Sequence, residues 1–357
     1  YDRAGKKYVT HILPVGVLNK DILNVIARGC VLNIKDLHEE LKEFSDVTSK
    51  TLQISGYCPL IEPTHILLDR IKYQSKLGTT ARGIGPAYSS FYARDSILFK
   101  DLIENPKESL MKMQENFFKL QLQIGSIDQP DDTKNIIDDN FNFFNEWIEN
   151  YNDIVSNISQ FIMKDESLII DLHNEGKNIL LEGAQGYGLN IHSNNYPDVT
   201  SSAPTIGGAL NSTGLNHKQI DEVIGVIKAY KTKVGTGEFP SRCKEKDENV
   251  LAKFGNEFGA TTGRPRKCGW LDLDEVNQAI KMNGVDHLCL IKTDVFTHIE
   301  EPKVYYKKNL IGMPSIDDVN INDKSFSSLL MLIKGLTEVN RVSFTTGPKR
   351  GEIVWCD

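Results

Sequence analysis

The sequence predicts an α/β fold: a mostly parallel central sheet flanked by helices, with a helical insertion subdomain. Short, nearly continuous apolar runs recur along the chain, and amphipathic helical patterns lie between them. Strands that helices cover on both faces of a parallel sheet have this continuous apolar character. Residues 101–174 lack such runs and show amphipathic spacing only, which predicts the helical insertion.

Four apolar runs are expected to be buried strands. Each is nearly continuous in apolar residues, as expected for a strand that is buried on both faces of a parallel sheet. The runs are NVIARGCVL (residues 24–32), KNILLEGAQG (177–186), EVIGVIKAY (222–230) and HLCLIKTDV (287–295). Between residues 300 and 323 the pattern is weak, and we expect loop and strand there.

Two helices carry clear end signals. Asn33 is a plausible N-cap for NIKDLHEELKEF. LDLDEVNQAIKMNG has Asp272 or Asp274 near its start and Gly284 just past its end, the usual asymmetry of helix caps. We expect one domain over residues 1–357, with residues 101–174 as a helical subdomain within it.

Composition excludes several classes of protein. The chain has 357 residues and a formal net charge of −7, with no long block of one sign, so neither a nucleic acid nor a membrane is an expected partner. No run approaches the roughly 18 apolar residues of a transmembrane helix. The six cysteines have no CxxC spacing and predict reduced thiols in the cytoplasm.

A first glycine-rich loop, KLGTTARGIGPAYSSFYARDS, covers residues 76–96. Its small residues let backbone N–H groups approach an anion, and Thr79, Thr80 and Arg82 can add donors. An ordinary surface loop punctuated by glycine and proline is an equal alternative.

A second loop covers residues 180–209, after a strand expected to end at Glu182. Gln185 lies between glycines, where its amide can read a purine edge or a hydroxyl through paired hydrogen bonds. The hydroxyls of Thr200, Ser201 and Ser202 suit either a phosphate or a helix N-cap, and the N-cap is the more common use. His192 has no evident metal partner and is expected at the surface.

A third loop is EFGATTGRPRKCGWLDLDEV, residues 257–276, which turns from cationic to apolar and helical. Arg264 and Arg266 stand on a glycine- and threonine-rich segment. Arginine forks bind carboxylate and phosphate through two hydrogen bonds, so this segment suits capture of an anion by a closing loop. A solvated turn is the simpler alternative.

A fourth pair of segments is LIKTDVF with the late TTGPKR. Lys292 and Asp294 after a buried strand suit guanine, since the carboxylate accepts from N1–H and the exocyclic amine while the lysine stem covers the ring. Alone this signal is weak. The chain has neither GxxxxGK[ST] nor GxGxxG, and no nucleophilic triad is evident.

Together these segments resemble the adenylosuccinate synthetase family. GTTARGIGPAY, EGAQG, YPDVTSS, VGTGEFP, EFGATTGRPRKCGWLD, KTDV and TTGPKR occur in the family's order and approximate spacing, from about Val9 to the C-terminus. The long GATTGRPRKCGWLD match is the most specific, and residues 101–174 add little.

The resemblance implies a P-loop NTPase-like fold and a GTP-dependent carbon–nitrogen ligase of purine (AMP) biosynthesis. Such an enzyme joins L-aspartate to IMP through 6-phosphoryl-IMP with Mg²⁺, giving adenylosuccinate, GDP and phosphate. It also implies a homodimer in which Arg94 reaches the neighbouring subunit's site. The implied IMP residues are Thr80, Arg94, Gln185, Thr200 and Arg264; the aspartate residues are Val234, Ala260, Thr261, Thr262, Gly263, Arg264 and Arg266; and the GTP residues are Arg266, Lys292, Thr293, Asp294, Thr345, Thr346 and Gly347.

The sequence departs from the family at its start. The family's GDEGKGK loop and N-A-G-H segment, which carry the catalytic aspartate, the catalytic histidine and the Mg²⁺ contacts, do not occur in it. We therefore expect an N-terminally incomplete chain with catalytic and metal residues upstream of Tyr1 and no metal ligand within it. Two alternatives remain open: a phage-type enzyme that joins dGMP to aspartate, and a non-catalytic nucleotide-binding relative.

Overall fold

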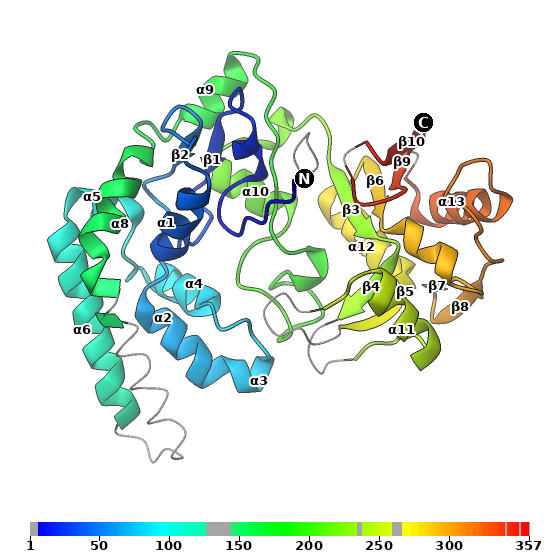
Figure 1. The fold of residues 1–357 in the computed structure, drawn as a ribbon, viewed down its shortest axis with the longest axis horizontal. Coiled ribbons are helices and arrows are strands. Elements are labelled where there is room, and N and C mark those ends of the chain that lie inside the picture. The colour runs from blue at the N-terminus through cyan, green and yellow to red at the C-terminus, as the bar shows by residue number, and fades with distance from the viewer. Residues whose placement is uncertain are drawn as a thin grey trace. The chain divides into compact units, whose positions relative to one another are not determined.

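The structure is a computed structural model that describes residues 6–125, 144–145, 147–233, 238–258, 266–339, 341–349 and 351–356. The chain divides into two compact units, one of Val9–Gln219 and one of Ile220–Asp357 together with Tyr1–Tyr8 (Figure 1). Helices and parallel strands occur in both units, which confirms the α/β class.

The unit of Ile220–Asp357 contains a four-stranded sheet in the order β10-β9-β6-β3. Strands β3 (Ile224–Lys228), β6 (His287–Ile291) and β9 (Arg341–Thr345) run parallel, and β10 (Ile353–Cys356) is antiparallel to β9. In the register, Lys228 pairs with Ile291 and Leu290 with Phe344. The carboxyl ends of the three parallel strands therefore lie at one edge of the sheet.

A second sheet of this unit has the order β4-β5-β7-β8. Its strands are β4 (Tyr230–Lys233), β5 (Lys267–Asp272), β7 (Lys303–Tyr306) and β8 (Asn309–Gly312). The hairpin of β7 and β8 confirms loop and strand between residues 300 and 323. The segment after Arg266 does not pass directly into a helix as expected, because its apolar residues first form β5.

Helices α11 (Glu245–Phe254), α12 (Leu273–Asn283) and α13 (Lys324–Thr337) and the short η6 (Thr293–His298) complete this unit around one core with the two sheets. The end signals of α12 are confirmed: Asp272 is the N-cap and accepts from the Glu275 N–H, and Gly284 is left-handed with φ 61°.

The unit of Val9–Gln219 is mostly helical, with one two-stranded parallel sheet of β1 (Asn24–Ile26) and β2 (Leu52–Ile54). Asn33 caps its first α-helix by accepting from Lys35 and Asp36 N–H groups, as predicted. The helices are η1 (Val15–Leu18), α1 (Ile34–Glu43), α2 (Pro63–Leu68), η2 (Asp69–Gln74), α3 (Ser75–Leu77), α4 (Ile84–Ala93), α5 (Phe99–Glu104), α6 (Pro106–Gly125), α8 (Tyr151–Ile158), η3 (Ser159–Phe161), α9 (Leu168–Asn174), η4 (Tyr187–Leu189), α10 (Ile206–Thr213) and η5 (His217–Gln219).

The described part of the expected helical stretch, residues 101–174, consists of helices and short connections. Phe117 on α6 stacks on Phe144 at a centroid distance of 4.3 Å, which joins two stretches of this segment through an apolar contact. The division into one domain with this subdomain stays a prediction.

Two strand predictions were wrong in part. Residues 177–186, all of them described, form no strand, and Leu180 is 87% exposed. A strand requires a backbone partner, which an apolar run alone does not provide. β3 is an edge strand rather than one buried on both faces, since the Val226 side chain is 62% exposed.

Candidate functional site

Three parallel strands bring predicted site residues together at one sheet edge. Lys228 ends β3, Lys292 follows β6 directly, and Thr345 ends β9. The Lys292 N–H donates to Thr345 Oγ1 at 3.1 Å, which ties the ends of β6 and β9. Ligands of open α/β sheets bind outside the carboxyl ends of the strands, so this edge is a candidate site.

The Lys292–Asp294 segment turns sharply at this edge. Lys292 adopts a left-handed backbone with φ 60°, an uncommon conformation for a residue other than glycine. The buried Thr293 donates its hydroxyl to the Thr345 carbonyl oxygen. Asp294 is only half-buried, and no hydrogen bond or ion pair from another described residue reaches its carboxylate. An acceptor placed in this way is available to a ligand's donors.

The turn between β9 and β10 carries Thr346 and Gly347. The Thr346 N–H donates to the Glu352 carbonyl oxygen at 2.9 Å, and the Glu352 Oε2 atom accepts from the Lys349 N–H at 2.6 Å. A Cβ on Gly347 would lie 2.4 Å from that Oε2 atom. A side chain at residue 347 would therefore displace the Glu352 carboxylate from the Lys349 N–H in the turn beside Thr345.

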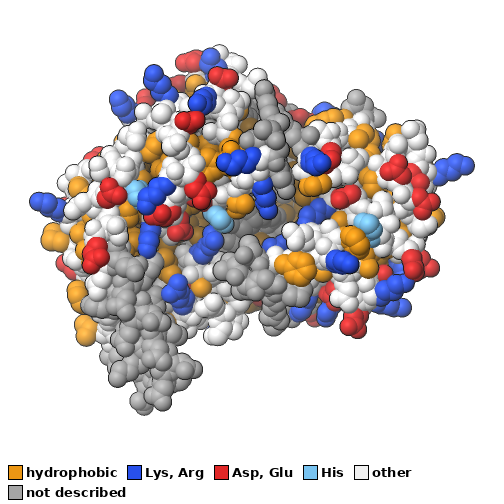
Figure 2. Space-filling model, in the orientation of Figure 1, with side chains coloured by type: hydrophobic (Ala, Val, Ile, Leu, Met, Phe, Trp, Pro, Cys, Tyr) orange, Lys and Arg blue, Asp and Glu red, His pale blue; other side chains and the backbone are white. Residues whose placement is uncertain are grey.

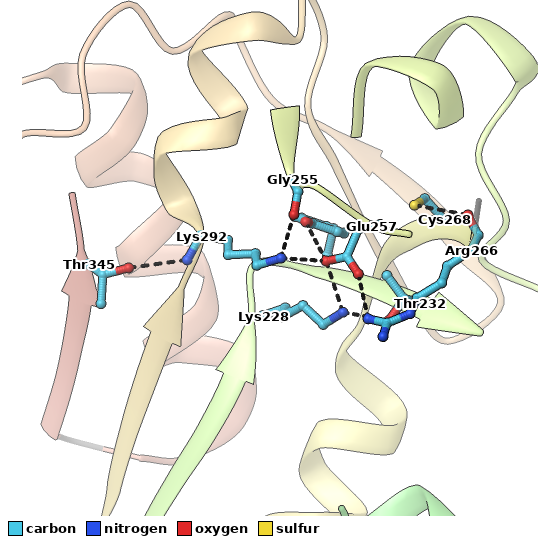
Figure 3. A network of polar contacts seen from close by, with 9 residues as sticks. Lys228, Thr232, Gly255, Glu257, Arg266, Cys268, Lys292 and Thr345 are labelled. Atoms are coloured by element: carbon cyan, nitrogen blue, oxygen red, sulfur yellow. Dashed lines mark hydrogen bonds and ion pairs between the residues drawn. The ribbon is translucent and has the colours of Figure 1, made fainter. Parts of the chain in front are cut away.

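Glu257 is the centre of a buried charge network at the same edge (Figure 3). Its Oε1 atom lies 2.7 Å from Lys292 Nζ and 3.0 Å from Lys228 Nζ, and it accepts from the Tyr230 hydroxyl at 2.8 Å. Its Oε2 atom lies 3.0 Å from Arg266 Nη1. One carboxylate thus faces three cations.

The pKa values of this network show what its environment favours. Burial alone would raise the pKa of Glu257, but hydrogen bonds from Lys292 and Tyr230 and the charge of Lys228 hold it at about 2. The pKa of Lys228 is lowered by burial and by repulsion from Lys292 and Arg266, although Glu257 opposes this. Burial together with Glu257 raises the pKa of Tyr230, so its hydroxyl stays protonated and donates.

Within the predicted anion loop the structure describes residues 257–258 and 266–276, and of the two predicted arginines it describes Arg266. Its backbone N–H donates to the Glu257 carbonyl oxygen at 2.9 Å, which joins the two ends of the loop between them. Val234 and the residues Ala260, Thr261, Thr262, Gly263 and Arg264 lie outside the described residues.

The other unit joins Gln185 to the hydroxyl cluster. Ser202 donates its hydroxyl to Gln185 Oε1 at 2.7 Å, and the Thr200 and Ser202 hydroxyl oxygens lie 3.2 Å apart. The N-cap alternative for these hydroxyls is wrong, because α10 begins after Thr205. The cluster therefore keeps hydroxyls that a ligand can use.

Asp69 holds the GTTARG loop (residues 78–83) through two hydrogen bonds. Its buried carboxylate accepts from the Thr79 hydroxyl at 2.7 Å and from the Gly83 N–H at 2.9 Å. Thr80 between them is exposed. A Cβ on Gly85 would lie 3.5 Å from Ser201 Oγ, so this loop and the hydroxyl cluster are neighbours.

Arg94 is not brought to Thr80. It is the exposed, left-handed C-cap of α4, whereas Thr80 precedes that helix. Ten residues of α-helix at a rise of about 1.5 Å put roughly 15 Å between the two ends. The two predicted IMP residues therefore lie at opposite ends of α4.

Comparison with known proteins identifies the family. The adenylosuccinate synthetase family model matches residues 2–339. The chain belongs to the adenylosuccinate synthetase family. An adenylosuccinate synthetase of Psychrobacter sp. (strain PRwf-1) is 37% identical over 308 residues, which are 84% of this chain and 69% of the relative. One of Wolinella succinogenes is 39% identical over 306 residues, 84% of this chain and 70% of the relative.

Solved structures support the family at the level of the fold. The fully ligated adenylosuccinate synthetase of Plasmodium falciparum has a TM-score of 0.81 and 25% identity, covering 99% of this chain and 89% of that one. A cyanophage S-2L succinoaminodeoxyadenylate synthetase bound to dGMP and dATP has a TM-score of 0.64 and 19% identity, covering 99% and 82%. The second likeness shows the fold alone. Membership of the adenylosuccinate synthetase family makes the chain a GTP-dependent ligase of purine biosynthesis.

Sequence reasoning missed four residues of these sites: Glu257, Lys228, Tyr230 and Asp69. Glu257 begins one of the motifs of the adenylosuccinate synthetase family, whereas Lys228, Tyr230 and Asp69 lie outside the motifs, and the residues that they contact in the sites are distant in the sequence. A Glu directly before the glycine loop was the one available signal for Glu257.

The remaining expectations concern metals and membranes. In the ranges that the structure describes, no group of three His, Cys, Asp or Glu side chains could hold a metal ion. The described helices include none that is long and apolar enough to cross a membrane. On the face shown in Figure 2, basic and acidic side chains are interspersed.

Proposed function

We propose that the chain ligates L-aspartate to IMP at the expense of GTP. In the first step the IMP O6 atom attacks the γ-phosphorus of GTP, forming 6-phosphoryl-IMP and releasing GDP. In the second step the aspartate amine attacks C6, and phosphate leaves with the C–O bonding pair. Phosphorylation turns a poor leaving group into a good one, and cations must stabilise the developing charge.

The observation that carries this proposal is the excess of positive charge around Glu257. Lys228, Lys292 and Arg266 leave a formal surplus of two charges after pairing with this carboxylate. Their side chains are 25%, 34% and 36% exposed, so an incoming anion can reach them. GTP and aspartate are both anions, and such a cationic edge favours them over neutral ligands.

The guanine assignment rests on the neighbouring strand ends. Asp294 presents a carboxylate without a described hydrogen-bond partner, and guanine offers it two N–H donors. Thr345, Thr346 and Gly347 form the closed turn beside it. We propose that this turn covers the base, that Thr293 secures it and that Arg266 contacts the phosphates.

The remaining ligands are assigned by residue. We propose that Thr80, Gln185 and Thr200 bind IMP in the arrangement that Asp69 and Ser202 support. Arg264 would contact IMP and aspartate, and Arg94 would bind the IMP phosphate of a neighbouring subunit in a homodimer. The proposed aspartate residues are Val234, Ala260, Thr261, Thr262, Gly263, Arg264 and Arg266.

Three broader assignments belong to the proposal. GTP would bring Mg²⁺ as the counter-ion of its phosphates. The enzyme would work in the cytoplasm, in keeping with six free cysteines. The chain would form one adenylosuccinate synthetase-like domain with residues 101–174 as its helical subdomain.

The test is a coupled assay on the full-length gene product. Phosphate release and the new nucleotide are measured with IMP or dGMP, each with aspartate and with GTP or ATP. We expect turnover with IMP and GTP. Turnover with dGMP only would replace the proposal by the phage-type reaction. Binding of GDP and IMP without any turnover would indicate a non-catalytic relative.

A further inference from the structure

Glu257 has no capacity left for a ligand. Its side chain is 0% exposed, and both oxygens are engaged: Oε1 by Lys292, Lys228 and Tyr230, and Oε2 by Arg266. A carboxylate enclosed in this way cannot contact substrate. Whatever it contributes to the reaction acts through the groups that it holds.

The position of Glu257 is itself set by the backbone. Its N–H donates to the Ala252 carbonyl oxygen at 2.9 Å, at the end of α11, and its carbonyl oxygen accepts from the Arg266 N–H at 2.9 Å, just before β5. Two elements thus fix the residue from both sides. The carboxylate is a rigid anchor rather than a flexible surface group.

Lys292 is held more closely than an ion pair requires. Its ammonium lies 2.7 Å from Glu257 Oε1 and donates to the Gly255 carbonyl oxygen at 2.5 Å. Ordering a lysine side chain costs conformational entropy. That cost is met before any ligand arrives, and the methylene stem is held two residues from Asp294 in the sequence.

Arg266 is held by the same carboxylate, which is the one described residue that its guanidinium contacts in a hydrogen bond. A guanidinium has five N–H donors, and the bond to Glu257 Oε2 uses one of them. Because the guanidinium is planar, the hydrogen bond to Glu257 also fixes the orientation of its other N–H donors. Pre-organised donors bind an anion more tightly than donors that must be ordered on binding.

We propose that Glu257 is a positioning residue that holds Lys292 and Arg266 together, so that one buried carboxylate presets the base end and the phosphate end of the nucleotide site. This inference rests on the proposed guanine-nucleotide site. A cluster that served stability alone would change the free energy of unfolding when altered and leave the affinity of the folded protein for nucleotide unchanged.

The test compares two Glu→Gln variants of the full-length gene product by calorimetric titration with GDP and with ADP. E257Q keeps the side-chain volume and removes the charge. We expect its Kd for GDP to rise at least tenfold at a temperature where circular dichroism shows it folded. E248Q is the matched control: Glu248 pairs with Arg242 at 2.9 Å and accepts from the Cys268 N–H at 3.0 Å, and its Kd for GDP should change less than twofold.

The outcomes separate the inference from the function on which it rests. If the wild type binds GDP no better than ADP, the guanine site fails and this inference fails with it. If the wild type prefers GDP but E257Q binds it as tightly, the guanine site stands and the positioning role is overturned. A lower melting temperature of E257Q without a change in its Kd would likewise overturn the positioning role.

A milder variant covers the case in which E257Q does not fold. Tyr230→Phe removes only the hydroxyl that donates to Glu257 Oε1 at 2.8 Å. We expect it to fold and to raise the Kd for GDP at least threefold. An unchanged Kd for this variant would overturn the positioning role independently.

Discussion

Arg266 binds Glu257 through both backbone and side chain, with N to O at 2.9 Å and Nη1 to Oε2 at 3.0 Å. The two residues flank the glycine-rich part of the anion loop. One neutral backbone hydrogen bond and one charge-assisted side-chain hydrogen bond join them. The charge-assisted bond is the stronger kind. The base of the loop is therefore fixed next to Lys292.

Acid should destabilise the protein through Glu257. Its pKa is held at about 2, below the ordinary value of 4.5, so its contribution is full above pH 4.5 and is lost as the pH falls towards 2. The loss is about 3 kcal/mol, since one unit of pKa difference is worth about 1.36 kcal/mol. Urea unfolding of wild type and E257Q should show a gap in free energy that narrows from pH 6 to pH 2.5.

A surface carboxylate provides the control for acid unfolding. Glu300 pairs with Lys246 at 2.7 Å, and its pKa is lowered too, but both side chains are exposed and screened by water. The free energy of unfolding of Glu300→Gln should equal that of the wild type at every pH. A gap between wild type and E257Q that stays constant with pH would contradict the role assigned to the Glu257 charge.

Gly347→Ala should weaken GDP binding. The new Cβ would lie 2.4 Å from Glu352 Oε2, so the carboxylate must move away from the Lys349 N–H and the turn loses that hydrogen bond. We expect the Kd for GDP to rise roughly three- to tenfold, with a loss of stability of about 1 kcal/mol for the broken hydrogen bond. Gly312→Ala is the matched control, because a Cβ there meets no described atom within 4 Å. Equal Kd values for the two variants would reject the turn as part of the site.

Asp69→Asn should raise the KM for IMP. The amide keeps the shape of the carboxylate but has a single acceptor oxygen, so the charge-assisted hydrogen bond from the Thr79 hydroxyl or the Gly83 N–H is replaced by a weaker neutral one, at a cost of about 1 kcal/mol. Asp323→Asn is the matched control: an Asn at the N-cap of α13 still accepts from the Phe326 N–H, so neither the stability nor the KM for IMP should change appreciably. If both variants leave the KM for IMP unchanged, the GTTARG loop does not bind this substrate.

Arg94→Leu should raise the KM for IMP, and mixing should reveal whether the site is shared. If each site takes Lys292 from one subunit and Arg94 from the other, a dimer of one Arg94→Leu and one Lys292→Met subunit has one site with both residues intact. Its other site carries both substitutions. Statistical mixing of equal amounts then restores about a quarter of wild-type activity. Activity that stays at the level of the separate variants would show that Arg94 serves its own subunit or none.

Much of the candidate site could be predicted from the sequence because its signals are local. The KTD and TTG segments follow directly on buried strands, and parallel neighbours β6 and β9 end at one edge, which brings Lys292 beside Thr345. The caps Asn33 and Asp272 depend on their own helices and were predicted correctly in the same way. Gln185 and Thr200 were predicted as ligand residues, and the structure adds the Ser202 bridge between them.

Two features could not be predicted from the local sequence pattern, because each depends on residues that are distant in the chain. KNILLEGAQG has the composition of a strand, yet a strand forms only where a second backbone accepts its hydrogen bonds, and residues 177–186 form none. Glu257 reads as the polar start of a glycine loop, but its cations come from positions 9, 29 and 35 residues away in the sequence. The sequence by itself determined the family and the α/β class, and it predicted which residues form the site. Only the tertiary structure decided which buried carboxylate holds them, because a charge network depends on distances that sequence separation does not set.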